Sequence, residues 1–165
     1  MKKIIYLLLI LWSLPGYSND AHHKQHKKMV GVEALSPELR KSLSLEMQAL
    51  QKGMMSIIPA YISGNWSEIK DTANKMKNSY ILKQSLTESQ LKELHTLLPH
   101  DFIKKDKNFH YLAGMLEHAA ENKKPELINF YFSEMNRSCV DCHSNYATHK
   151  FPALLPKKKK DEHHH

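Results

Sequence analysis

The stretch PELINFYFSEMNRSCVDCHSNY, residues 125–146, carries a helical pattern and a chemical motif together. Its apolar residues recur at spacings of four and three, which is the period of one face of an α-helix. That face consists of Ile128, Phe132, Met135, Cys139, Cys142 and Tyr146. Proline suits the first turn of a helix, so Pro125 fits its start. The stretch therefore predicts a long helix with both cysteines of the chain on its buried side.

Within this helix, Cys139-Val140-Asp141-Cys142-His143 is a C-x-x-C-H sequence, which is typical of covalent attachment of a c-type haem. Two thiols at this spacing can form thioethers with the two vinyl groups of one porphyrin. The adjacent imidazole can then bind the iron as its proximal axial ligand. We therefore predict one covalently bound haem c, held by Cys139 and Cys142, with His143 on the iron.

Two other uses of the motif are weaker. A thiol–disulfide pair usually accompanies a βαβ pattern, and the sequence shows no strand alternation. A structural zinc site needs four ligands. Because the chain has 2 cysteines, histidines from elsewhere would have to complete such a site.

The N-terminus has the pattern of an export signal. Lys2 and Lys3 precede an apolar run from Ile4 to Leu14, and the small residues that follow predict cleavage after Ser18. The run is short for a membrane span. Because bacteria attach c-type haem outside the cytoplasm, in a compartment that oxidises thiols, the signal and the motif support each other. They predict a periplasmic protein.

The remaining chain has the length of one domain. We predict a signal peptide over residues 1–18, a disordered basic segment over 19–34, a haem-binding bundle over 35–150 and an irregular basic tail over 151–165. Much of the formal net charge of +7 lies in the two ends. Such terminal runs are usually solvated and disordered, and the functional alternative is attraction of an acidic redox partner protein or a membrane surface. No aromatic residues are interleaved with these lysines, so nucleic acid is not expected as a partner. The histidines 163–165 fit a tag fragment or a native metal-binding end.

Helical patterns fill the central region. Ser36 and Pro37 suit the cap and first position of a helix that ends at residues 63–65, and further helices are expected over about 66–82, 101–122 and 125–146. Thr87 and Gln90 fit a capping box that begins a short helix in the long linker. Short turns favour antiparallel neighbours. The predicted fold is all-α: an antiparallel up-down-up-down four-helix bundle with a short extra helix in the linker between helices two and three.

The topology points to a sixth iron ligand. In such a bundle the end of the last helix lies beside the start of the first. The apolar seam of the first helix contains Leu43, Met47, Leu50, Met54, Ile57 and Tyr61. Met47 falls at the level of His143, whereas Met54 lies about 10 Å further along at 1.5 Å per residue. We therefore predict Met47 as the distal ligand, although a methionine on a seam can also serve packing alone.

Other residues compete for roles near the iron. Phe109 is expected to pack against the haem, because an aromatic face excludes water and tunes the reduction potential. An open sixth position, His95 and His110 remain alternatives to Met47, although such histidines are more often solvated or hydrogen-bonded.

This arrangement resembles the class II cytochromes c, the group of cytochrome c-prime and the low-spin cytochrome c-556. Those proteins are four-helix bundles with C-x-x-C-H near the C-terminus, a motif matched here by Cys139, Cys142 and His143. The stretches 109–114 and 119–122 are also similar to a helix of cytochrome b-562. The resemblance covers roughly residues 35–146. It implies a helix-one methionine on the iron in low-spin members, for which Met47 is the nearest match, and an open gas-binding pocket in high-spin members. The linker helix with Glu93-Leu94-His95 departs from the pattern.

We therefore expect a periplasmic monohaem cytochrome that carries electrons. The alternative is a high-spin, cytochrome c-prime-like protein that binds nitric oxide or carbon monoxide at an open sixth position. No nucleotide loop, second redox motif or paired acid–base group is present, so an enzyme is not expected. Because bundles of this kind often pair through their first two helices, a homodimer is compatible with the resemblance.

Overall fold

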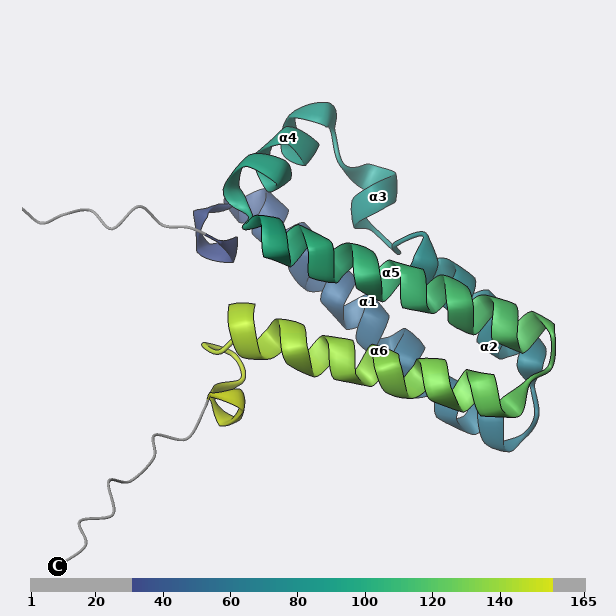
Figure 1. Ribbon diagram of the computed structural model, residues 1–165. Coiled ribbons are helices and arrows are strands. Elements are labelled where there is room, and N and C mark those ends of the chain that lie inside the picture. The colour runs from purple at the N-terminus through teal and green to yellow at the C-terminus, as the bar shows by residue number, and fades with distance from the viewer. Residues whose placement is uncertain (1–30, 156–165) are drawn as a thin grey trace, which may run out of the picture.

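The computed structural model describes residues 31–155, and in this range the chain is all-helical without a β-strand. The prediction of an all-α fold is confirmed. The elements, shown in Figure 1, are the 3-10 turn η1 (Val32–Ala34), the helices α1 (Pro37–Ile62), α2 (Trp66–Lys77), α3 (Leu82–Ser85), α4 (Glu88–Leu97), α5 (His100–Glu121) and α6 (Pro125–Tyr146), and the 3-10 turn η2 (Pro152–Leu154). The predicted signal peptide lies outside the described residues.

Local signals account for most helix ends. Pro37 occupies the first turn of α1, and the capping box of Thr87 and Gln90 begins α4 as predicted. Gly64 turns the chain between α1 and α2 with a φ of 68°, a conformation that glycine adopts without strain. Two boundaries differ from the prediction, because η1 and η2 give regular turns to residues expected to be disordered or irregular.

The second helix ends earlier than predicted, at Lys77 instead of about residue 82. The reason is a competing acceptor on α1. The backbone N–H groups of Tyr80, Ile81 and Leu82 donate to the Glu46 carboxylate at 2.9, 2.6 and 3.2 Å. Because these N–H groups bond to Glu46 and not to carbonyl groups of the preceding turn, the helix stops and the short α3 begins a new direction.

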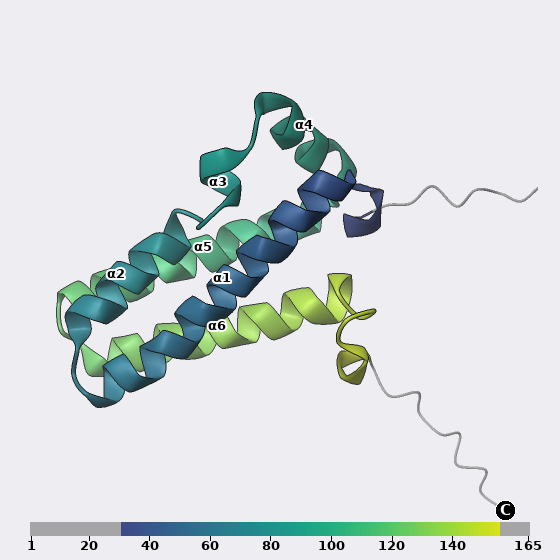
Figure 2. The same cartoon turned by 180° about the vertical axis from the view of Figure 1, so that it is seen from behind.

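The long helices pack in chain order: α1 against α2, α2 against α5, and α5 against α6. Gly53 lies where α1 approaches α2: a Cβ atom there would lie 3.3 Å from Met76 Sδ and 3.4 Å from Thr72 Cγ2 of α2, and 2.6 Å from the hydroxyl oxygen of Tyr80 after α2. At one end of the molecule, the Tyr61 hydroxyl on α1 donates to the Pro125 carbonyl at the start of α6, at 3.3 Å. Figures 1 and 2 both show the ribbons of α1 and α6 separating toward the other end, where η1 and η2 lie.

The buried apolar residues form two clusters. The main cluster joins α1, α2, α5 and α6 at the end where α1 and α6 meet, and includes Leu50, Ile57, Met76, Leu116 and Met135. The minor cluster joins the start of α1 to α4 and includes Leu35, Leu39, Leu43, Leu94 and Leu98. On α1 the division between them falls at residues 44–49, which therefore mark a level where the apolar core is interrupted. None of the described helices is long and apolar enough to cross a membrane.

Candidate functional site

The C-x-x-C-H motif lies in the last two turns of α6, at the end where α6 separates from α1. Cys139 and Cys142 are both half-buried, with free thiols. Cys139 packs against the main apolar cluster. The helical phase predicted from the sequence is therefore correct in direction, and the two thiols lie three residues apart on the inward side of one helix.

Burial determines the ionisation of the motif. It raises the pKa of the Cys142 thiol to about 11, with a further contribution from the charge of Asp106, and it also raises the pKa of Cys139. A reactive thiol–disulfide motif needs the opposite, a lowered pKa that provides thiolate. Burial, aided by the charge of Lys150, lowers the pKa of the His143 imidazole. A neutral imidazole has a free nitrogen lone pair, which is the form that binds a metal.

The segment after α6 folds back onto the motif. The ring of Phe151 stacks on His143, with centroids 4.5 Å apart and an interplanar angle of 12°. One face of the imidazole is therefore covered by an aromatic ring, while the ring edge that carries the nitrogens is not used by this contact. Tyr146 packs edge-on against Phe102 of α5, and its hydroxyl donates to Asp101 at 3.0 Å. These contacts hold the end of α6 to the start of α5.

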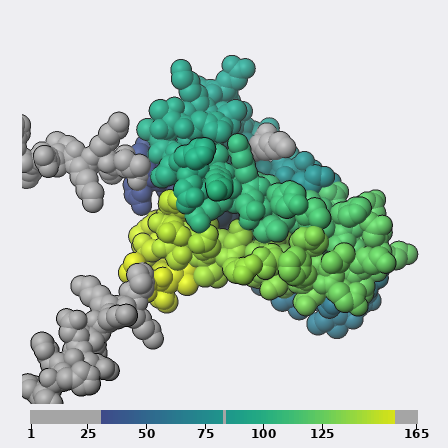
Figure 3. All heavy atoms as spheres, in the orientation of Figure 1, coloured from purple at the N-terminus to yellow at the C-terminus, as the bar shows by residue number. Residues whose placement is uncertain are grey.

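Charged residues, among them Lys105, Glu134, Arg137 and Asp141, line the seam between α5 and α6. Figure 3 shows the surface of the molecule from the side of these two helices. A groove of about 500 Å³ runs along this seam. Its wall includes Lys105, which pairs with Asp141 of the motif and lies 3.7 Å from Asp101. Arg137 pairs with Glu134 one turn before Cys139. The exposed side of the motif is thus joined to α5 by the Lys105–Asp141 ion pair, and Cys139 on its other side packs against the apolar core.

Met47 does not occupy the centre of the α1 seam as predicted. Its side chain is 38% exposed, whereas the neighbouring Glu46 is 1% exposed. The rest of the predicted seam is confirmed, since Leu43, Leu50, Met54 and Ile57 are buried. At this one turn Glu46 is buried in place of Met47, because its carboxylate binds the N–H groups of residues 80–82. Met47 is therefore not committed to core packing, and its role as an iron ligand stays a prediction.

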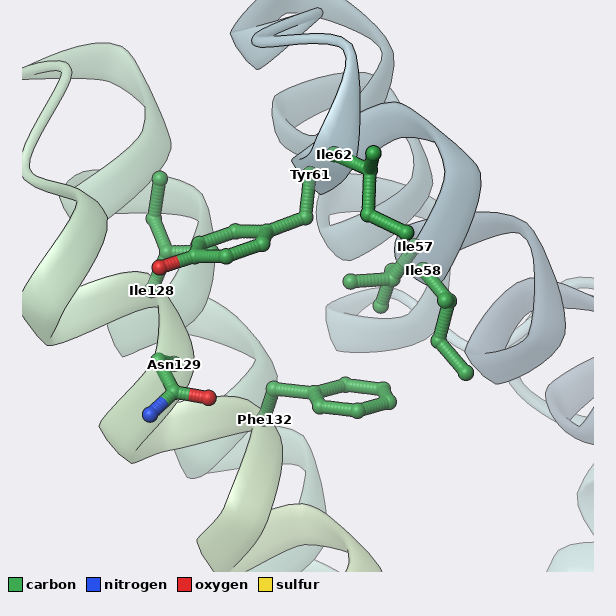
Figure 4. Close-up of a pocket in the computed structure, with 7 residues that line it drawn as sticks. All are labelled: Ile57, Ile58, Tyr61, Ile62, Ile128, Asn129 and Phe132. Carbon is green, nitrogen blue, oxygen red and sulfur yellow. The ribbon is translucent and has the colours of Figure 1, made fainter.

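A small pocket between α1 and α6 provides a reference point for comparing the positions of Met47 and His143 along the two helices. Near the end where α1 and α6 meet, a pocket of about 190 Å³ is lined by Ile57, Ile58, Tyr61 and Ile62 of α1 and by Ile128, Asn129 and Phe132 of α6 (Figure 4). Ile58 and Phe132 therefore face each other across it. Met47 precedes Ile58 by 11 residues, and His143 follows Phe132 by 11 residues. Eleven residues are close to three helical turns, so each residue shares the face of its pocket partner about 16 Å further along.

Counted along the two helices, Met47 and His143 therefore lie about equally far from the pocket, on the helix faces that carry Ile58 and Phe132. This inference needs the two helices to run in opposite directions. Their contacts agree: the end of α1 meets the start of α6 through Tyr61, and His149 beyond α6 lies 3.7 Å from Glu33 before α1. The level coincides with the interruption of the apolar core between the two clusters.

The other predicted residues fall into separate environments. Phe109 is buried in the main cluster, against which Cys139 also packs, so its predicted contact with a haem is compatible with its position. His95 is exposed on α4. His110 is half-buried, and both ring nitrogens have partners: Nδ1 donates to the Met76 carbonyl at 2.7 Å, and Nε2 lies 3.5 Å from Asp106.

The bonded state of His110 predicts a pH-dependent stability. Burial alone would lower the pKa of this imidazole, but the hydrogen bond and charge of Asp106, together with the Met76 carbonyl, outweigh it and raise the pKa. A raised pKa in the folded state stabilises the protein below the ordinary histidine pKa, and this contribution is lost as the pH rises through the raised value. In urea unfolding, His110→Gln should therefore lose more stability at pH 5 than at pH 8.5.

Asp106→Asn provides the matched variant for this measurement. It keeps the imidazole and removes the carboxylate that raises the pKa. The difference in unfolding free energy between pH 5 and pH 8.5 should shrink in Asp106→Asn as it does in His110→Gln. A loss of stability in His110→Gln that is equal at both pH values would contradict the assignment.

The donor set of the site suits a covalent haem. A porphyrin supplies four of the six iron ligands, so the protein needs one or two axial donors and, for a c-type haem, two thiols. Cys139, Cys142 and His143 offer this set, whereas residues 31–155 contain no group of three or more His, Cys, Asp or Glu side chains that could hold a metal ion. The residues present fit a c-type haem better than a zinc ion bound by protein ligands alone.

Two residues near the site were not identified from the sequence. The sequence does contain a pattern that could have identified Glu46. It belongs to a second regular seam of α1, which includes a carboxylate among apolar residues: Leu39, Leu43, Glu46, Leu50, Ile57 and Ala60. Phe151 had none, since its stacking on His143 depends on how the chain turns after α6. Comparison of the chain with protein-family models, with curated proteins and with solved structures finds no match in any of the three.

Proposed function

We propose that this protein is a periplasmic monohaem c-type cytochrome that carries electrons. In this proposal the four long helices form an antiparallel up-down-up-down bundle of the class II cytochrome c type. Cys139 and Cys142 hold the haem covalently, and His143 is the proximal ligand of its iron. The C-x-x-C-H motif at the inward side of α6 supports covalent attachment.

The observation that carries the electron-transfer function is the register of Met47 and His143. The two residues lie equally far from Ile58 and Phe132, which line one pocket between α1 and α6. An imidazole on one side and a thioether on the other would complete the coordination of the iron. Iron in such a six-coordinate site changes oxidation state with little change in geometry, which suits rapid electron transfer, and the thioether raises the reduction potential.

The surrounding residues have supporting roles in this proposal. Phe151 covers one face of the proximal imidazole, and Phe109 adds apolar surface near Cys139. Lys104, Lys105 and Arg137 line the exposed seam next to the motif. The same seam also contains Asp101, Glu134 and Asp141, so attraction of an acidic redox partner rests on the formal net charge of +7 of the chain. We propose that the protein exchanges electrons with such a partner protein, does not bind nucleic acid and is not an enzyme. A homodimer is compatible with this function.

A gas-binding function is the second candidate, because one observation favours it. Met47 is 38% exposed and belongs to the N-terminal half of α1, the half that separates from α6 in Figure 2. If its thioether does not reach the iron, the sixth position would be open to carbon monoxide or nitric oxide. His110 is a weaker ligand than Met47 in this arrangement, since both of its nitrogens are already engaged.

Optical spectra of the protein expressed with haem-attachment machinery test the proposal. The oxidised protein should show low-spin bands and a weak far-red band from sulfur–iron bonding. The reduced protein should bind carbon monoxide slowly or weakly, because Met47 occupies the sixth position. A high-spin spectrum with rapid binding of carbon monoxide would instead support the gas-binding candidate. Protein without bound haem would contradict both.

A further inference from the structure

Among the residues whose burial the structure describes, Glu46 is the only charged side chain that is buried. Its carboxylate accepts three backbone N–H groups, from Tyr80, Ile81 and Leu82. These donors belong to the segment that follows α2, so the contact ties that segment to the middle of α1. Burial of a carboxylate is costly unless hydrogen bonds compensate it, and here the compensation comes from peptide groups. The described side chains form no ion pair with Glu46.

The position of Glu46 relates it to the candidate site. It directly precedes Met47, and successive residues of a helix point about 100° apart. Met47 shares a helix face with Ile58, which lines the pocket against α6. The Glu46 carboxylate instead faces the segment 80–82. Its three hydrogen bonds therefore fix the rotation of α1 about its axis at the turn that carries Met47.

The charge of Glu46 also reaches groups around this level. It contributes, after burial, to the raised pKa of Tyr80, and it adds to the raised pKa of His110 on α5. A charge in a buried, poorly polarisable environment acts over longer distances than a charge in water. An iron centre at the level of Met47 would lie within the same field. Because the oxidised iron carries one more positive charge than the reduced iron, a nearby carboxylate favours the oxidised state.

We infer that Glu46 is the positioning residue of the distal side and that its buried charge lowers the reduction potential of the iron. The inference rests on the proposed function, because it concerns the same haem. Two effects then oppose each other: the thioether of Met47 raises the reduction potential, and the carboxylate one residue earlier limits that rise.

Glu46→Gln tests the charge. Glutamine has nearly the same shape and keeps one oxygen to accept N–H groups, but it carries no charge. In the haem-loaded variant, potentiometric titration should give a higher midpoint potential, with the far-red band retained. For a unit charge about one helix diameter away, roughly 10–12 Å, at an effective dielectric constant of about 20, the ferrous-to-ferric ratio at fixed ambient potential should rise roughly tenfold.

Glu93→Gln is the matched control. The Glu93 carboxylate also accepts a backbone N–H, from Ser36 at 2.5 Å. Glu93 belongs to α4, and Ser36 directly precedes α1. Ser36 precedes Glu46 by ten residues, or about 15 Å along the helix. The midpoint potential should therefore stay close to that of the unchanged protein. A purely structural role of Glu46 would lower stability in Glu46→Gln without moving the midpoint potential.

A second variant keeps the positioning part testable if Glu46→Gln folds too weakly for potentiometry. Glu46→Asp retains the charge but is one methylene shorter, so it should strain the contacts to residues 80–82 and weaken the far-red band. An undiminished band in Glu46→Asp overturns the positioning role, and an unchanged midpoint potential in haem-loaded Glu46→Gln overturns the charge role. Absence of haem from the unchanged protein would instead overturn the proposed function.

Discussion

Replacement of both cysteines, Cys139→Ala with Cys142→Ala, is expected to abolish covalent haem attachment. Each thioether of a c-type haem requires one of these thiols, and the chain contains 2 cysteines in all. After denaturation and acid–acetone extraction, the unchanged protein should keep essentially all of its haem with the polypeptide. The double variant should release essentially all haem that it still binds. Haem staining after denaturing electrophoresis measures the difference directly.

The helical fold should survive this replacement. Both cysteines are half-buried, and truncation of such a side chain to alanine costs about 1 kcal/mol. Circular dichroism of the haem-free double variant should therefore match that of the haem-free unchanged protein. Val140→Ala is the matched control: Val140 lies inside the motif and is 52% exposed, so haem attachment should persist. If the unchanged protein loses its haem to acid–acetone, thioether attachment is excluded.

Met47→Ala is expected to convert a low-spin haem into one with an open sixth position. The far-red sulfur–iron band should vanish, the midpoint potential should fall because the thioether is lost, and carbon monoxide should bind rapidly. The cost in folding stability should be at most about 1 kcal/mol, since the side chain is 38% exposed. The expected signature is thus a large spectroscopic change with a small change in unfolding free energy.

Two neighbouring methionines serve as controls for Met47→Ala. Met55 is 64% exposed, so Met55→Ala should change neither the spectrum nor the stability by much. Met54 is 8% exposed within the main cluster, so Met54→Ala should cost about 2–4 kcal/mol and leave the far-red band intact. Loss of the band in Met54→Ala with retention in Met47→Ala would mean that the register between α1 and α6 is wrong.

The sequence predicts local structure correctly where the signals for it are also local. The starts of α4 and α6, the end of α1 and the helical phase of Cys139 all follow from patterns within a few residues. Capping, proline at the first turn and apolar spacing act between residues that are close in the chain, so they can be recognised in a short stretch of sequence. The all-α class follows from the same signals, summed along the chain.

The predicted end of α2 is wrong because the residue that stops this helix lies elsewhere in the chain. The residues after Lys77 have an acceptable helical pattern, but their N–H groups bond to Glu46, more than thirty positions earlier in the sequence. No window of the α2 sequence contains this partner. The same contact buries Glu46, so the observed seam of α1 differs from the predicted one at Met47, while Leu43, Leu50, Met54 and Ile57 are buried as predicted.

The sequence by itself determined the helices, the C-x-x-C-H motif and its inward phase on α6, because these depend on covalent order and on the 3.6-residue period of the helix. Only the tertiary structure decided the burial of Glu46 beside the partly exposed Met47, the early end of α2, and the stacking of Phe151 on His143. The first two depend on a contact between residues more than thirty positions apart, and the third depends on how the chain turns after α6, so none of them follows from the helical period.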